Sequence, residues 1–194
     1  MKKKTIVPLT VFLVGICLLG LFTYNTNVQI QNNQRTLVLM NAKTYGQRIE
    51  DDLEAGVQIT NSLEQVLINS DGQIHDFSKI AKYMMSSSIQ SVQLAPNGVV
   101  SEIYPEEGNE AGKIDLLNDE NRGQISNYAK EYHTTILQGP FELKQGGSGI
   151  AIRNPVYLED ENGKEYFWGF TIVVIRVPKV FEDSTNALSR FGYT

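Results

Sequence analysis

The chain has 194 residues, of which 41% are hydrophobic and 20% are charged. This length and composition predict one folded domain and exclude a disordered chain. All acidic residues lie beyond Tyr24, whereas Lys2, Lys3 and Lys4 are three of the 17 basic residues, so the remainder is more acidic than the net charge of −5 indicates. Such a charge argues against nucleic acid as a partner, because binding to phosphates depends on Lys and Arg. One Cys and two His exclude a disulfide framework and leave little material for a metal site.

The N-terminus predicts a membrane anchor. An uncharged, mostly apolar run covers residues 5–24, directly after the three lysines, and about 20 apolar residues suffice for a helix to cross a bilayer. Lysines favour the cytoplasmic side, so we expect a single-pass protein of the cell membrane, with residues beyond the span outside the cytoplasm. The alternative is a cleaved signal peptide, but the run does not end in the small residues that a cleavage site needs. Cys17 follows Ile16 rather than a small residue, which argues against a lipoprotein.

A long helix is predicted to continue from the membrane helix over residues 27–69, where there is no proline. A stripe at spacings of three and four resembles a heptad seam and consists of Leu39, Ala42, Gly46, Ile49, Leu53, Gly56, Thr60, Leu63 and Leu67. Two interpretations remain open: the stripe packs on the domain that follows, or it pairs with a second copy in a parallel dimer. We expect both, on different faces of the helix.

The remaining elements predict an α+β fold. We expect a short helix over 76–86 with Asp76 as its N-cap, a helix over 118–133 capped by Asn118 or Asp119, and five strands over 89–94, 99–104, 135–143, 149–158 and 165–177. The run at 170–177 is too short to cross a bilayer and is taken as a buried strand. This order is that of a PAS-like module, in which helices flank a five-stranded antiparallel sheet.

Four parts of the chain are therefore expected. They are a cytoplasmic N-terminus with a transmembrane anchor (1–26), a long stalk or dimerisation helix (27–70), a PAS-like subdomain (71–181) and the start of a truncated C-terminal helix (182–194).

Three stretches together carry a resemblance to a known family. Residues 93–117 (QLAPNGVVSEIYPEEGNEAGKIDLL), 136–157 (ILQGPFELKQGGSGIAIRNPVY) and 165–175 (EYFWGFTIVVI) resemble, in this order and spacing, the membrane-distal half of the CHASE domain. That domain is the extracytoplasmic ligand-sensing module of bacterial diguanylate cyclases and histidine kinases, and of plant cytokinin receptors. The resemblance covers about residues 37–194 and implies a sensor that binds a small molecule. The family's proximal subdomain, second membrane span and cytoplasmic enzyme are not expected in this chain.

The resemblance also implies a pocket between the sheet and the helix that crosses over it. Asp115 matches a family position that binds ligand, although by itself it is a loop or cap residue. Strand alternation places Ala151 and Arg153 on one face and Ile150, Ile152 and Asn154 on the other. A buried guanidinium needs a partner, and for Arg153 this is either Asp115 or an anionic group on the ligand.

Further pocket-lining residues follow from positions that match the family. Phe141, Leu143, Phe167 and Thr171 are expected on the pocket walls and Tyr104 on the rim, whereas Trp168 and Phe170 are expected to pack on the long helix. No cofactor, metal or catalytic residue is predicted, because Ser148 lies in a Gly-rich turn and both histidines lie in polar surroundings. The sequence thus predicts an anchored, homodimeric sensor domain without enzymatic activity. The alternative is a stand-alone anchored protein that binds a ligand or partner without signalling.

Overall fold

The computed structural model describes residues 3–107, 112, 114–143 and 146–177, so the predicted helix at 182–194 lies outside the described residues. The chain divides into two compact units, Met1–Gln47 and Arg48–Thr194. Helix α1 (Lys3–Asn69) is continuous and contributes to both units. This confirms the prediction of one long N-terminal helix.

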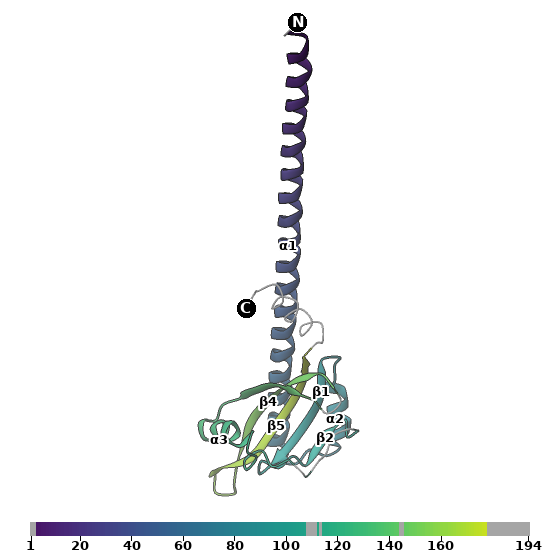
Figure 1. Ribbon diagram of the computed structural model, residues 1–194. Helices are drawn as coiled ribbons and strands as arrows, with labels where there is room; N and C mark the ends of the chain where they lie inside the picture. The colour runs from purple at the N-terminus through teal and green to yellow at the C-terminus, as the bar shows by residue number, and fades with distance from the viewer. Residues whose placement is uncertain (1–2, 108–111, 113, 144–145, 178–194) are drawn as a thin grey trace. The chain divides into compact units, whose positions relative to one another are not determined.

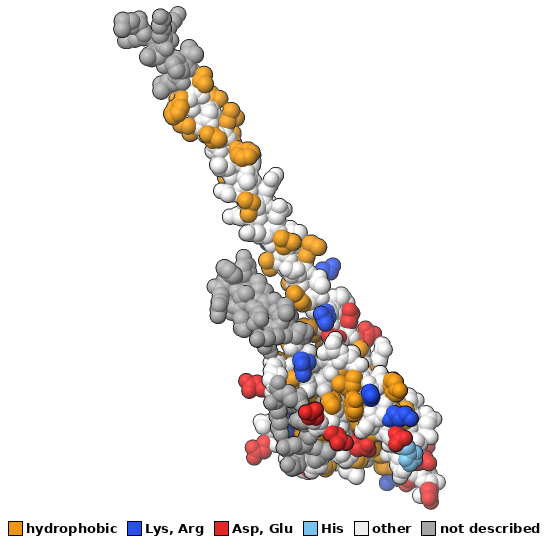
Figure 2. All heavy atoms as spheres, turned by 90° about the vertical axis from the view of Figure 1, so that its right-hand side faces the viewer, with side chains coloured by type: hydrophobic (Ala, Val, Ile, Leu, Met, Phe, Trp, Pro, Cys, Tyr) orange, Lys and Arg blue, Asp and Glu red, His pale blue; other side chains and the backbone are white. Residues whose placement is uncertain are grey.

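The first unit consists of the N-terminal part of α1. Large apolar side chains from Val11 to Tyr24 are exposed along it, and Figure 2 shows them as a string of hydrophobic patches on the helix. Among the described residues, the helix segment Thr10–Asn69 is long and apolar enough to cross a membrane, with a mean hydropathy of 1.7 in its most apolar part.

The second unit contains a five-stranded antiparallel sheet in the order β2-β1-β5-β4-β3, which confirms the predicted α+β class. Helix α2 lies beside β1 and β2, and helix α3 lies beside β3 and β4 (Figure 1). The bounds are α2 (Phe77–Met84), β1 (Ile89–Pro96), β2 (Glu102–Tyr104), α3 (Gly123–Tyr132), β3 (Ile136–Glu142), β4 (Ser148–Glu159) and β5 (Glu165–Val177).

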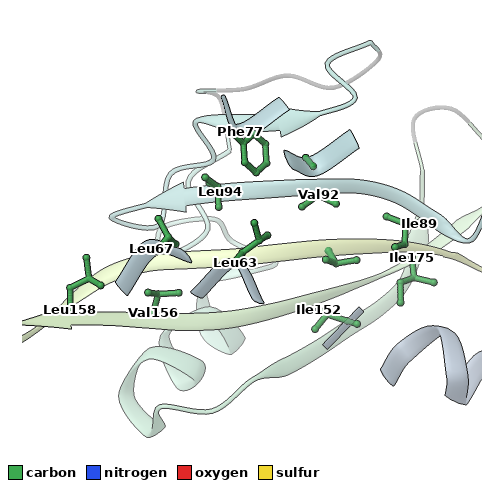
Figure 3. Packing of buried hydrophobic residues seen from close by; sticks show 12 residues of the cluster. Leu63, Leu67, Phe77, Ile89, Val92, Leu94, Ile152, Val156, Leu158 and Ile175 are labelled. Atoms are coloured by element: carbon green, nitrogen blue, oxygen red, sulfur yellow. The ribbon is translucent and has the colours of Figure 1, made fainter. Parts of the chain in front are cut away.

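The C-terminal part of α1 covers one face of this sheet. Gly56, Thr60, Leu63 and Leu67 recur at helical spacing, and all four are buried. Figure 3 shows Leu63 and Leu67 over Val92 and Leu94 of β1 and over Ile152 and Val156 of β4. A Cβ atom at position 56 would lie 2.5 Å from the Ile152 Cδ1 atom, so the glycine permits a close approach of helix and strand. Over residues 53–67 the stripe therefore packs on the chain's own sheet, as the first interpretation predicts.

Hydrogen bonds fix α1 on this face. The Thr171 hydroxyl donates to the Thr60 carbonyl at 3.0 Å. The buried Asn154 amide donates to the Glu64 carboxylate at 2.8 Å, and its oxygen accepts from the Thr135 hydroxyl, also at 2.8 Å. Because every polar group of Asn154 that faces α1 is satisfied, its burial carries little penalty.

The opposite face of the sheet has its own apolar core, closed by α3 and residues 114–117. Buried members of this core are Ala95, Val100, Ile103, Leu116, Ala129, Ile136, Ala151, Phe170, Ile172 and Val174. The two faces are thus covered independently.

A β-bulge reverses the predicted orientations of Phe170 and Thr171 in β5. Val156 pairs with Gly169, but the next residue, Tyr157, pairs with Phe167, so Trp168 is an extra residue. Phe167 and Phe170 therefore share the α3 face, with ring centroids 5.1 Å apart. Trp168 packs on the α1 face as predicted and donates to the Gly72 carbonyl at 3.1 Å, whereas the prediction that Phe170 packs there is wrong, because an inserted residue shifts the two-residue period.

Helix α2 begins at the predicted N-cap, whereas α3 begins later than predicted. Asp76 lies at the N-cap position of α2, but its side chain makes no capping hydrogen bond. Helix α3 begins at Gly123 because the preceding residues form a turn in which the Asp119 Oδ1 atom accepts from the backbone N–H groups of Asn121 and Arg122.

Candidate ligand-binding site

Arg153, at the middle of β4, is a charged side chain buried within the apolar sheet of the second unit. It pairs with Ile136 of β3 and Ile172 of β5 and is only 3% exposed. The predicted alternation is confirmed, since Ala151 belongs to the core on the α3 face and Ile152 to the core on the α1 face. Arg153 therefore projects to the side that α3 covers.

The guanidinium of Arg153 is only incompletely satisfied by protein groups. Its Nε and Nη1 atoms are buried without a hydrogen-bond partner. Burial, followed by the Arg122 charge, lowers the pKa of Arg153 to about 10, even though the Asp119 charge opposes both effects. The side chain thus stays charged at neutral pH, in a place where an unpaired charge is unfavourable.

The nearby carboxylate of Asp119 is already engaged. Its Oδ2 atom accepts from Arg122 Nη1 at 2.7 Å, while Oδ1 accepts two backbone N–H groups at 2.9 Å. Burial raises the pKa of Asp119, but these hydrogen bonds and the Arg122 charge outweigh it, so the pKa lies below its ordinary value. Asp119 therefore forms its ion pair with Arg122, and within this group of three the positive charge of Arg153 is left uncompensated.

Two neutral polar groups on the same face also lack partners. Gln138 of β3 pairs with Ala151 in register, so its side chain lies on the Arg153 side of the sheet, and its Oε1 atom is buried without a partner. The hydroxyl of Ser126, buried on α3, is in the same condition. Arg153, Gln138 and Ser126 are called the polar cluster below.

The predicted site residues divide between the two faces. Phe141, Leu143 and Phe167 are partly buried against the core of the α3 face, on the side of Arg153. Tyr104 packs against the α1-face core, and Thr171 faces α1, to whose backbone it donates. The shared pocket wall predicted for Phe167 and Thr171 is therefore not formed, because the bulge at Trp168 separates their faces.

Asp115 lies in the segment that covers the α3-face core, but it does not pair with Arg153. Its carboxylate accepts from the side-chain amide of Asn118 at 2.8 Å and from the N–H groups of Leu117 and Asn118 at 3.1 Å. These bonds, led by the Asn118 side chain, hold its pKa below the ordinary value. The structure thus gives Asp115 a role in a turn, and the Asp115–Arg153 ion pair, one of the two alternatives for Arg153, is not formed.

Aromatic contacts hold the C-terminal end of α3 against the sheet. The His133 ring stacks on Tyr157 of β4 with centroids 3.8 Å apart, and the Tyr157 hydroxyl donates to the Lys130 carbonyl. The Lys130 ammonium lies 4.7 Å from the centre of the Phe167 ring. Burial and the Glu165 charge raise the pKa of Tyr157, so this hydroxyl remains a donor at neutral pH.

Ser126, Gln138 and the Asp119–Arg122 pair were not predicted from the sequence. Gln138 lies two residues after Ile136 and therefore on the same face of its strand. A polar side chain at such a core position could have indicated a binding residue. Ser126 precedes Ala129 by three residues on the buried side of α3. The charged pair has no such signal, because it depends on the turn before α3. Among the described residues, no group of His, Cys, Asp or Glu could hold a metal ion.

Comparisons with known proteins agree with this architecture. The family model of the CHASE domain matches residues 28–192. An extracellular ligand binding receptor from Desulfohalobium retbaense DSM5692 has a similar fold, with a TM-score of 0.54 and 16% sequence identity over 73% of this chain. The match covers 25% of that receptor's length. No curated protein matches the chain.

Replacement of Arg153 by Met is expected to stabilise the fold. Met keeps the apolar part of the side chain and removes an unpaired buried charge, and such changes are worth about 1–3 kcal/mol. Urea denaturation of the full-length protein in detergent, followed by the fluorescence of the one tryptophan, Trp168, measures the free energy of unfolding. The matched control, Arg48→Met on an exposed part of α1, should change it by less than about 0.5 kcal/mol. A loss of stability in Arg153→Met would contradict the unsatisfied state of this guanidinium.

Proposed function

Because the chain belongs to the CHASE domain family, we propose that it is the input part of a signalling receptor and senses a small anionic molecule through Arg153. The charged end of the molecule lies between the sheet and α3 and accepts hydrogen bonds from the guanidinium. Gln138 and Ser126 contact the same molecule. The chain itself carries no catalysis, and a cytoplasmic diguanylate cyclase or histidine kinase supplies the response.

One observation carries this proposal: the guanidinium of Arg153 is buried and charged, and two of its nitrogens have no protein partner. Structural arginines in protein interiors are normally paired. An anion that accepts from Arg153 would satisfy both nitrogens and offset the charge that Asp119 leaves uncompensated. Phe141, Leu143 and Phe167, on the same side of the sheet, are proposed to contact the rest of the molecule. Asp115 borders this side, whereas Tyr104 and Thr171 are not proposed as contacts.

The anchor is proposed to be the N-terminal part of α1. Its exposed apolar side chains (Figure 2) and the lysines at positions 2–4 favour a helix across the bilayer with the N-terminus in the cytoplasm. The second unit then lies outside the cytoplasm, where it meets external ligands. This arrangement makes the sheet domain the sensor.

Ligand binding is tested by a thermal-shift screen of the full-length protein in detergent against small carboxylates, phosphate esters and neutral metabolites. Binding to the native state raises the melting temperature by mass action, so we expect stabilisation by anionic compounds. The same compounds should give no shift with Arg153→Met, which removes the charge. Arg48→Met should respond like the wild type. Hits that are all neutral, or that stabilise Arg153→Met equally, would refute the role of Arg153.

The orientation is tested by fusion of a reporter after Thr194. If residues 5–24 form an uncleaved anchor, a reporter that is active only outside the cytoplasm should give signal. The chain should also stay in the membrane fraction at its full 21.7 kDa. A shorter, soluble product would identify the segment as a signal peptide.

A homodimer is proposed to form through α1 before the sheet domain. Leu37, Val38, Leu39 and Met40 are 49–61% exposed, in contrast to the buried part of the stripe. In a background that lacks Cys17, a cysteine at Leu39 should crosslink to its counterpart under mild oxidation, and one at Asn41 should do so much less. Equal crosslinking at the two positions would mean that the helix has no defined dimer seam.

A further inference from the structure

We propose that the polar cluster selects short-chain hydroxycarboxylates, in which an uncharged hydroxyl stands close to the carboxylate. This assignment rests on the function proposed above and names the class of molecule that the Arg153 site takes. Arg153 binds the carboxylate, and the Gln138 side chain accepts from the hydroxyl.

The anionic end follows from the donors. Arg153 has two buried N–H positions, at Nε and Nη1, without acceptors. The neighbouring Asp119 does not serve them, because it accepts from Arg122 and from the backbone of its own turn. A carboxylate offers two oxygens with several lone pairs and thus satisfies a guanidinium better than a neutral acceptor does.

The need for a donor on the ligand follows from Gln138. Its Nε2 atom donates to the Asn121 carbonyl at 3.1 Å. Because a carbonyl only accepts, this bond fixes which end of the amide is which. The other end, Oε1, is a buried acceptor without a donor. A ligand that is only an acceptor would leave this oxygen unsatisfied, which costs affinity.

The two contacts are close enough for one small molecule. Gln138 is in register with Ala151, and Arg153 is two residues further along β4 on the same face. Such diagonal neighbours on adjacent strands lie about 7–8 Å apart at their Cα atoms, and both side chains are long. A chain of three or four heavy atoms therefore spans from the guanidinium to the amide oxygen. Ser126 is buried on α3, which covers this side of the sheet, and its hydroxyl is able to donate or accept.

The sign of the local charge favours a hydroxyl over an ammonium. Asp119 pairs with Arg122 at 2.7 Å, and two nitrogens of the neighbouring Arg153 have no partner. Lys130 adds a positive charge on α3, above Phe167. An ammonium placed beside Gln138 would be repelled by these groups, whereas a neutral hydroxyl donates to the same oxygen without that penalty. The cluster is thus expected to discriminate against amino acids.

Three probes with the same carbon skeleton test this inference: propionate has no donor, lactate has a hydroxyl, and alanine has an ammonium. Their dissociation constants are measured by calorimetric titration of the full-length protein in detergent. Lactate is expected to bind at least about tenfold more tightly than propionate, the usual effect of satisfying one buried acceptor. Alanine is expected to bind more weakly than lactate by a similar factor.

Variants identify the residue that reads the hydroxyl. Gln138→Leu should bring lactate to the level of propionate, while propionate itself changes little. The matched control Gln58→Leu, the same exchange at an exposed position of α1, should retain the preference for lactate. Melting of each variant, followed by Trp168 fluorescence, verifies that it is folded. Should Gln138→Leu fail to fold, Gln138→Met is used in its place.

The outcomes separate this inference from the function on which it rests. Equal affinity for lactate and propionate, or tighter binding of alanine, overturns the inference but leaves an Arg153-dependent anion site. A preference for lactate that persists in the folded Gln138 variant also overturns it. If none of the three probes binds while other anions protect the wild type and not Arg153→Met, the ligand class is wrong and the sensor function stands. If no anion depends on Arg153, both are refuted.

Discussion

The packing of α1 on one face of the sheet is the contact on which the rest of the second unit depends. Thr60, Leu63 and Leu67 have no exposed surface, and Gly56 lets the helix approach the central strands closely. A sheet in water needs cover on each apolar face. Since α1 and α2 cover the first, α3 and the segment before it must cover the second. The candidate site thereby falls on the side away from α1, beneath the short helix α3.

Neighbouring residues of β4 show what is unusual about that side. Arg153 and Asn154 are buried to a similar extent, but Asn154 has a donor and an acceptor at ordinary hydrogen-bond distances. Arg153 has neither a carboxylate of its own nor partners for two of its nitrogens. A fold that needed only stability would favour an apolar residue there. Binding sites are commonly less stable than an apolar core would be. The unsatisfied guanidinium is therefore stronger evidence for a binding site than the aromatic residues on the same side of the sheet.

The fold follows from sequence patterns far better than the site does. The turn residues predict β5 at its observed bounds. Alternation predicts which residues of β4 lie on each face of the sheet, because β4 pairs with β5 in a fixed register. The bulge at Trp168 breaks the period without a local signal, so the sides of Phe170 and Thr171 are predicted wrongly. Arg153 is recognisable as a charge within an apolar strand, but residue spacing does not decide between Asp115 and a ligand as its partner. Which polar atoms stay unsatisfied depends on the turn at Asp119 and on the pairing of β3, and neither is encoded in residue spacing.

The alternation of β4 also has a thermodynamic consequence. Arg153 and Asn154 are consecutive, so the backbone that positions the guanidinium on one side also positions the amide that donates to Glu64 of α1 on the other. If a ligand at Arg153 shifts this strand, it favours the matching arrangement of the Asn154–Glu64 contact. Because binding free energies are reciprocal, a partner of α1 that shifts the same contact would then alter the affinity of the opposite face. Under the proposed function, β4 is thus the element through which site occupancy and helix position are linked.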